Sequence, residues 1–115
     1  MSHKTVLVVD DDVDIRESLR DAFEDAGYVV RCAANGREGL EALRSFDRPC
    51  VVVLDLIMPV MTGNELYDAM QADPQLADVP VIMSTSDASP APSGVLLLKK
   101  PINLQTMLAT IGRFC

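Results

Sequence analysis

The chain has 115 residues, enough for one domain with a single hydrophobic core. Hydrophobic residues make up 49% of it and charged residues 23%, the balance of a globular domain rather than of a disordered segment. Seventeen acidic against ten basic residues give a net charge of −7, which argues against direct nucleic-acid binding and favours cations or basic partner surfaces. We therefore expect residues 1–115 to form a single acidic domain.

Targeting signals, cysteines and histidine narrow the function further. No apolar run approaches the roughly 20 residues that span a bilayer, and residues 1–5 lack the features of a signal peptide, so we predict a cytoplasmic protein without membrane contact. Cys32, Cys50 and Cys115 form no C-x-x-C pair, and their odd number disfavours a disulfide framework. We expect all three to be reduced, with only Cys115 available for an intermolecular bridge. The single histidine, His3, argues against metal sites rich in His or Cys and against a Ser-His-Asp triad.

Short apolar runs alternate along the chain with amphipathic stretches. Three to five residues rich in β-branched types, without polar alternation, are typical of strands buried on both faces of a parallel sheet. The runs are Val6–Val9, Val29–Val30, Val51–Leu54, Val81–Met83 and Val95–Leu98.

Four helices are predicted between and after these runs. Apolar residues at helical spacing from Ile15 onwards predict a first helix that ends at Gly27. A second helix follows the Asn35-Gly36 turn. A third helix is expected over about 63–73, and a fourth after Asn103, which is a good N-cap. Alternating strands and helices of this kind predict a doubly wound α/β fold with right-handed crossovers. Neither of the common glycine-rich nucleotide-binding motifs is present.

Chemistry-bearing residues follow several of the predicted strands directly. Ligands of open parallel sheets sit at the carboxyl ends of the strands, so these residues should converge. A helix cap needs only one aspartate, and adjacent buried carboxylates repel each other unless a cation is bound. The residues in question are Asp10-Asp11-Asp12, Asp55, Ser84-Thr85-Ser86 and Lys99-Lys100.

Taken together, four sequence blocks resemble the receiver domain of two-component response regulators. They occur in the family's order and cover nearly the whole chain. The resemblance implies a flavodoxin-like, five-stranded parallel sheet with the strand order 2-1-3-4-5. The blocks are VLVVDDD (residues 6–12), VVLDLIMPVMTG (52–63), VIMSTS (81–86) and KP (100–101).

The resemblance also assigns a metal site and a phosphoacceptor. Asp55 matches the aspartate that takes up a phosphoryl group, and Asp10 and Asp11 match the acidic pair that holds Mg²⁺ or Mn²⁺ with it. The main-chain carbonyl of Ile57 matches a further metal ligand. Magnesium prefers octahedral oxygen coordination, which this set can supply. Gly63 is expected to shape the loop after Asp55 by adopting conformations that other residues resist.

Two further positions match the family's switch residues. Thr85 corresponds to the hydroxyl that turns towards the phosphoryl group, and Lys100 to the lysine that pairs with it. The Lys100–Pro101 bond is cis in this family. The implied phosphoryl donor is a histidine kinase or a histidine phosphotransfer protein, with a separate output protein or domain. Such a domain is not an enzyme in the usual sense, because it catalyses only its own phosphorylation and dephosphorylation.

Two features depart from the family pattern. Leu97 stands where receivers usually carry an aromatic residue, so switching coupled to a ring is not expected. The connection 86–94 has two prolines and no large apolar side chain, so the helix between strands 4 and 5 is predicted to be missing or vestigial. Loss of that helix would uncover Ile82, Val95 and Leu97, or their neighbours on the same face. We expect the face formed by strand 4, strand 5 and the last helix to bind the output partner or to form a homodimer by a non-standard face.

Two other functions compete with a phosphorylatable receiver. Leu97 and the short connection also suit a receiver-like interaction module that does not switch. A phosphatase of the haloacid dehalogenase type is the third possibility, since Asp10 to Asp12 contain D-x-D. However, Asp14 stands where that motif requires Thr or Val, and the chain is short for that fold. Retention of all the matched site positions favours the phosphorylatable receiver.

Overall fold

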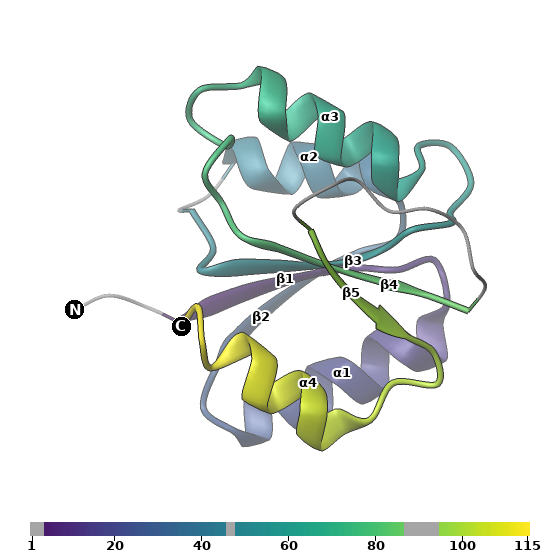
Figure 1. Cartoon of the computed structure of the whole chain (residues 1–115), viewed down its shortest axis with the longest axis vertical. Helices are drawn as coiled ribbons and strands as arrows, with labels where there is room; N and C mark the ends of the chain where they lie inside the picture. Colours follow the sequence, from purple (N-terminus) through teal and green to yellow (C-terminus); the bar gives the residue numbers. More distant parts are fainter. Residues whose placement is uncertain (1–3, 46–47, 87–94) are drawn as a thin grey trace.

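The computed structural model describes residues 4–45, 48–86 and 95–115. These residues form three layers, in which a five-stranded parallel sheet lies between two pairs of helices (Figure 1). Helices α2 and α3 cover one face of the sheet, and α1 and α4 cover the other. Within the described ranges, no helix is long and apolar enough to cross a membrane.

All five strands predicted from the apolar runs are present, and the order β2-β1-β3-β4-β5 confirms the predicted topology. Every neighbouring pair is parallel. The strands are β1 (Thr5–Val9), β2 (Val29–Ala33), β3 (Val51–Asp55), β4 (Val81–Thr85) and β5 (Leu96–Lys99). The helices are α1 (Val13–Asp25), α2 (Gly36–Ser45), α3 (Gly63–Ala72) and α4 (Leu104–Ile111).

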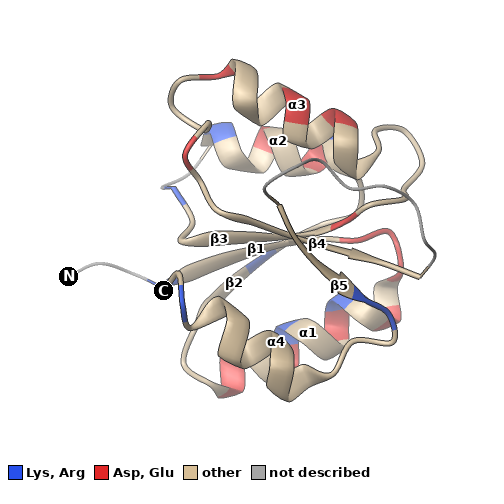
Figure 2. Cartoon of the chain, in the orientation of Figure 1, with Lys and Arg blue, Asp and Glu red and all other residues tan. Residues whose placement is uncertain are grey.

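The core consists of two apolar layers, one on each face of the sheet. Side chains alternate along a strand, so Leu7 and Val9 of β1 pack towards α2 and α3, whereas Val6 and Val8 pack towards α1 and α4. The central strands β3 and β4 are buried along their whole length. Charged residues lie mainly on the helices and at the strand ends (Figure 2). This distribution explains why the central strands read as unbroken apolar runs.

Local signals set the helix ends. Asp12 caps α1 through its side chain, which accepts hydrogen bonds from the main-chain N–H groups of Asp14 and Ile15. Gly27 follows α1 with a φ of 99°, a left-handed conformation that glycine adopts without strain. Asn103 caps α4 as predicted.

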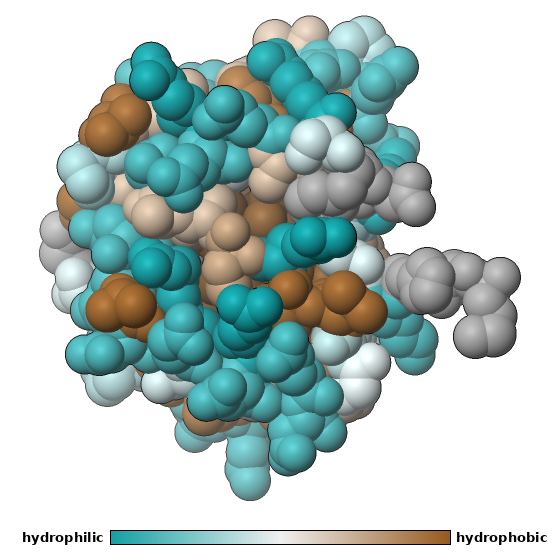
Figure 3. Space-filling view, turned by 180° about the vertical axis from the view of Figure 1, so that it is seen from behind, coloured by the Kyte–Doolittle hydropathy of each residue, from teal (hydrophilic) through white to brown (hydrophobic). Residues whose placement is uncertain are grey.

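The two edges of the sheet differ. The face seen from behind in Figure 3, on the side of β2, is mainly hydrophilic, with scattered hydrophobic residues. Strand β5 forms the other edge and is only partly buried, and its Leu96 is exposed. The prediction of a missing helix concerns residues 86–94, of which 87–94 lie outside the described residues, and the described part of the chain contains four helices.

One prediction about the β5 side is wrong. Ile82 was expected to lose its cover, but it is fully buried in the layer beneath α1 and α4. The reason is the alternation along β4, which points Ile82 towards α1 and α4. Val95 and Leu97 are partly buried and pack against the opposite layer, towards α2 and α3.

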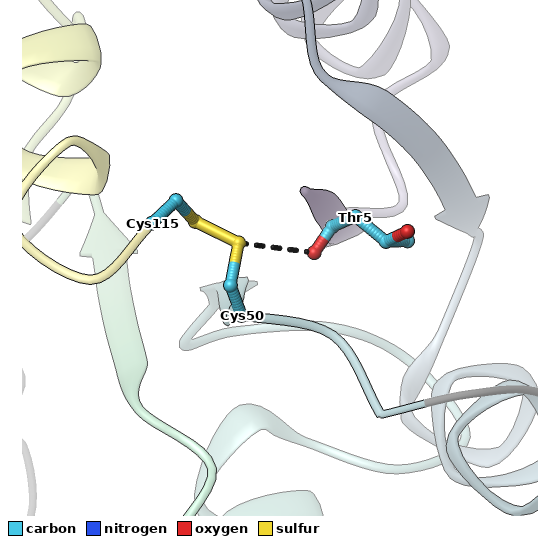
Figure 4. Close-up of a disulfide and its surroundings, with 3 residues drawn as sticks. All are labelled: Thr5, Cys50 and Cys115. Carbon is cyan, nitrogen blue, oxygen red and sulfur yellow. Dashed lines mark hydrogen bonds between the residues drawn. A yellow bond between two sulfur atoms is a disulfide. The ribbon is translucent and has the colours of Figure 1, made fainter. Parts of the chain in front are cut away.

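The cysteine prediction also fails. Cys50 and Cys115 form an intramolecular disulfide with their Cα atoms 5.4 Å apart, and Cys32 is free (Figure 4). Helix α4 runs back towards the edge of the sheet where the strands begin, and the turn after it brings Cys115 next to Cys50, just before β3. The expectation that all three cysteines are reduced, with Cys115 available only for an intermolecular bridge, did not take this return path into account. As predicted, Cys32 and Cys50 are not bonded to each other.

Candidate functional site

The acidic residues predicted to converge do so at the carboxyl ends of β1 and β3. Asp10 follows β1 and Asp55 is the last residue of β3, which pairs directly with β1. Both side chains are almost fully buried, and the neighbouring Asp11 is exposed. Carboxylate oxygens of the three residues lie within 4.8 Å of one another. Figure 2 shows this acidic edge of the sheet next to the basic end of β5.

Lys100 joins the cluster from the end of β5. Its Nζ lies 2.9 Å from Oδ2 of Asp10 and 3.4 Å from Oδ2 of Asp55. The ammonium group is itself largely shielded, with 14% of the side chain exposed. One cation thus bridges two buried carboxylates that would otherwise repel each other at close range.

The protonation of this cluster follows from burial and charge together. Burial raises the pKa of Asp55 and the Asp10 carboxylate raises it further; Lys100 and the main-chain N–H of Ile57 offset only part of this, leaving the pKa at about 6. Burial lowers the pKa of Lys100, but its hydrogen bonds and ion pairs with Asp10 and Asp55 outweigh burial, so the net shift is upward. Counted by formal charge, the site holds three carboxylates and one ammonium group, which leaves two negative charges.

That donor set fits a hard divalent cation. Mg²⁺ and Mn²⁺ bind carboxylate and carbonyl oxygens together with water, and the exposed Asp11 leaves one side of the cluster open to solvent. The two excess negative charges match the charge of one such ion. Ile57, whose carbonyl was predicted as a further ligand, lies in the loop after β3, and its N–H donates to Oδ1 of Asp55 at 3.3 Å.

The main chain fixes the orientation of Asp10. Its Oδ1 accepts a hydrogen bond from the N–H of Asp12 at 2.9 Å, and its own N–H donates to the carbonyl of Ala33 at 3.1 Å. Arg16 donates from Nη1 to the Asp10 carbonyl at 2.8 Å. The sequence interpretation missed Arg16, although a basic residue in the first turn of a helix is unfavourable beside the helix dipole and could have indicated a local partner.

The two predicted switch positions, Thr85 and Lys100, lie at the ends of the neighbouring strands β4 and β5. Thr85 is the last residue of β4 and is 1% exposed. Its carbonyl accepts a hydrogen bond from the N–H of Lys100 at 2.8 Å, which ties the ends of β4 and β5 together. The Lys100–Pro101 bond is cis, as the resemblance implied.

Gly63 has a different role from the one predicted. Among the described glycines only Gly27 has a positive φ, so unusual backbone conformation is not the reason for glycine at 63. A Cβ at this position would lie 2.5 Å from the carbonyl oxygen of Asp55 and 2.8 Å from Cα of Leu56. Glycine is required because the first turn of α3 lies directly against the backbone that carries Asp55.

Comparison with known proteins identifies the family that this site belongs to. The family model described as "Response regulator receiver domain" matches residues 6–111. The chain belongs to this family. The family assignment confirms the resemblance seen in the sequence blocks, and the match spans every strand from β1 to β5.

Individual relatives agree with this assignment. Response regulator MprA of Mycolicibacterium vanbaalenii is 38% identical over 111 residues, covering 90% of this chain and 47% of that protein. Protein Rrf1 of Nitratidesulfovibrio vulgaris is 34% identical, covering 94% of this chain and 80% of that protein. The structure of the chemotaxis protein CheY4 of Vibrio cholerae superposes with a TM-score of 0.89 at 36% identity, covering 99% of this chain and 100% of that one. The chain spans about half the length of MprA and most of the length of Rrf1.

Proposed function

We propose that this receiver domain accepts a phosphoryl group on Asp55 and thereby controls a protein–protein interaction. The observation that supports this most directly is the joint arrangement of Asp10, Asp11, Asp55 and Lys100 at one edge of the sheet. A capping role for the acidic run does not account for it, because Asp12 alone caps α1.

The proposed chemistry is phosphoryl transfer from a phosphohistidine. A carboxylate oxygen of Asp55 attacks phosphorus, the phosphorus–nitrogen bond breaks, and the histidine nitrogen leaves with the electron pair. Lys100 already lies 3.4 Å from Asp55, so its ammonium group can pair with the transferred phosphoryl oxygens. Transfer of the phosphoryl group would therefore replace the ion pair between Lys100 and the unphosphorylated Asp55 carboxylate.

Mg²⁺ or Mn²⁺ would be held by Asp10, Asp11, Asp55 and the main-chain carbonyl of Ile57. When bound, the cation neutralises the negative charge that phosphoryl oxygens and carboxylates bring together. Without it, Lys100 is the one ammonium group among the described residues that is paired with Asp10 and Asp55. We therefore propose that phosphorylation depends on a divalent cation.

Thr85 is proposed as the hydroxyl that responds to the phosphoryl group. It lies at the end of β4, and its carbonyl is bonded to the N–H of Lys100, so a change at Asp55 can reach β5 through a short path. Leu97 replaces the family's usual aromatic residue, and any switch here works without a moving ring. The alternative is a receiver-like interaction module that does not switch.

The location, the phosphoryl donor and the output partner of the domain are also part of the proposal. We propose that residues 1–115 act as one receiver domain in the cytoplasm, with a histidine kinase or histidine phosphotransfer protein as donor. The output partner, or a second copy of the chain, would bind on the partly exposed β5 side of the sheet, where Leu96 is exposed. The domain would catalyse only its own phosphorylation and dephosphorylation.

The deciding experiment is intact-mass analysis after incubation with acetyl phosphate and Mg²⁺. We expect a gain of one phosphoryl group in the parent protein, none in Asp55→Asn, and none when a chelator removes the cation. Asp12→Asn is a matched control, since asparagine also caps helices and Asp12 is not a member of the cluster. Undiminished labelling of Asp55→Asn would refute the phosphoacceptor assignment, and no labelling of the folded parent would favour the non-switching module.

A further inference from the structure

The disulfide lies at the edge of the molecule opposite the acidic cluster. Cys50 immediately precedes β3 and Asp55 ends that strand, so the two sites are separated by the length of one strand, about 17 Å. The bond connects residues 65 positions apart and attaches the turn after α4 to the start of β3 (Figure 4). None of the chemistry proposed at Asp55 uses it.

Helix α4 is therefore held at both of its ends. The chain before it begins at Lys100, which is paired with Asp10 and Asp55. The helix itself is anchored by Met107 in its middle and by Ile111, its last residue, both of which are fully buried. Its far end is held by Cys115, through the bond to Cys50. Phosphorylation would act on the ion pairs of Lys100, before α4, and the redox state of the cysteines would act on the disulfide after it.

The surroundings of Cys50 suit both redox states. Its Sγ lies 3.3 Å from the main-chain carbonyl oxygen of Thr5 (Figure 4). A disulfide sulfur has no hydrogen to donate, so this contact becomes a hydrogen bond when Cys50 is a thiol. Reduction would thus leave a thiol that already has an acceptor. Cys50 and Cys115 are also both only partly buried, which allows a small thiol or disulfide to reach them.

Cys32 provides a contrast within the same chain. It is free, and burial raises the pKa of its thiol although Arg20 and Arg16 lower it in part. A raised pKa reduces the fraction of thiolate, which is the form that attacks disulfides. Cys32 therefore has no disulfide partner, and its thiol ionises less readily than an exposed one.

We propose that Cys50 and Cys115 form a reversible thiol–disulfide pair that fastens or releases the end of α4. The proposal rests on the proposed cytoplasmic function, because disulfides of cytosolic proteins are usually transient or redox-sensing rather than permanent. The oxidant is a low-molecular-weight disulfide such as oxidised glutathione. One cysteine thiolate attacks it and releases one glutathione thiolate; the second cysteine then attacks the mixed disulfide and releases the other. The two protons lost by the cysteine thiols are taken up by the two released glutathione thiolates. The two electrons lost by the cysteines reduce the glutathione disulfide.

Oxidation should stabilise the domain and order the turn after α4. Closing a loop of 65 residues restricts the unfolded chain, and this raises the melting temperature by about 10 °C for a domain of this size. In the folded state, the N–H groups of Phe114 and Cys115 both donate to the carbonyl of Ile111, and these bonds are held by the disulfide. Reduction should make these two amides exchange faster with solvent, while amides within the sheet change little.

The test is a titration of the purified chain with mixtures of reduced and oxidised glutathione. Denaturing alkylation and intact mass count the thiols, and melting and amide exchange are measured on the two end states. We expect one thiol after oxidation and three after reduction, full reversibility, and a lower melting temperature in the reduced form. Cys32→Ser should behave as the parent does, and Cys50→Ser and Cys115→Ser should lose the response. If Cys50→Ser does not fold, Cys115→Ser, altered outside the sheet, supplies the same information.

Two results would overturn the proposal. One is a Cys50–Cys115 bond that millimolar reduced glutathione cannot open in the native protein, since the bond would then be a permanent one. The other is a reduced protein that oxidised glutathione fails to close. Labelling by acetyl phosphate, measured in parallel, should be the same in both redox forms. If neither form is labelled, the proposed function fails, yet the thiol counts still decide the redox proposal.

Discussion

Asp55 is subject to two opposing electrostatic effects. Burial and the Asp10 carboxylate raise its pKa, whereas Lys100 and the N–H of Ile57 lower it, and the result is a pKa of about 6. A carboxyl group with a raised pKa binds protons more tightly in the folded than in the unfolded chain. Its ionisation therefore destabilises the fold as the pH rises from about 4 to about 6.

Asp55→Asn should accordingly be more stable than the parent at pH 7 when no divalent cation is present. Each pKa unit corresponds to about 1.4 kcal/mol, and the pKa of Asp55 is raised from 3.8 to about 6, so we expect a gain of about 3 kcal/mol in the free energy of unfolding. The gain should shrink as the pH falls below about 6 and vanish only below about pH 4, where Asp55 becomes protonated in the unfolded chain as well. Urea unfolding in a chelator-containing buffer at several pH values measures the difference.

A matched control for this prediction is Asp68→Asn, on the exposed side of α3. It removes the same charge from the chain, so any effect of net charge alone will appear in both variants. Equal stability changes in the two variants, or a gain in Asp55→Asn that does not depend on pH, would contradict the electrostatic account. Lys100 keeps its 2.9 Å contact with Asp10 in Asp55→Asn, so the ammonium group remains paired.

At the scale of residues, the sequence revealed those site members whose chemistry is unusual for their position. Asp10, Asp11, Asp55 and Lys100 follow apolar strands, where charges are rare, and the structure brings all four together. Arg16 was not recognised, because its hydrogen bond to a main-chain carbonyl depends on how α1 turns back over the end of β1. A charged residue that follows an apolar strand can be recognised in the sequence, whereas a hydrogen bond to a main-chain carbonyl cannot.

At the scale of elements, the packing of α3 against β3 gives a second prediction. Gly63→Ala places a methyl group 2.5 Å from the carbonyl oxygen of Asp55, and neither backbone can move away without disturbing the sheet. We expect a loss of about 2 kcal/mol or more in the free energy of unfolding, as for overpacked cores. Because the displaced backbone carries Asp55, labelling by acetyl phosphate should fall as well.

Gly112→Ala is the control for this prediction. Gly112 follows α4 with helical φ and ψ, and a Cβ there would make only ordinary contacts, at 3.4 Å and beyond. Alanine should be neutral or slightly stabilising at that position. Thermal melting of both variants checks the pair, and a Gly63→Ala variant that melts with the parent would show that α3 can shift without loss.

The predicted elements were accurate wherever local signals determine them. Apolar runs identified all five strands, and Gly27 and Asn103 marked helix ends as expected. Cys115 was misjudged because its position depends on the direction in which α4 returns along the sheet, and sequence spacing contains no such information. Ile82 was misjudged for a related reason, since the face it occupies follows from the pleat of β4.

At the scale of the whole molecule, part of the chain's negative charge is buried at the site. The net charge is −7, and the cluster contributes two uncompensated negative charges in an enclosed place. Exposed charges elsewhere are screened by water and salt, whereas the buried Asp10 and Asp55 are screened far less. Bound cations should therefore stabilise the entire fold through this one location.

Addition of Mg²⁺ should raise the melting temperature of the parent protein by several degrees, because a ligand that binds only the folded state stabilises it. A comparison buffer with NaCl at equal ionic strength separates binding from screening. Asp11→Asn should remove most of the response, since Asp11 is the exposed and most accessible member of the cluster. Asp14→Asn, a neighbouring acid on α1 outside the cluster, should retain it. A parent protein that melts at the same temperature with Mg²⁺ and with matched NaCl would contradict the metal site, and with it the proposed route to phosphorylation of Asp55.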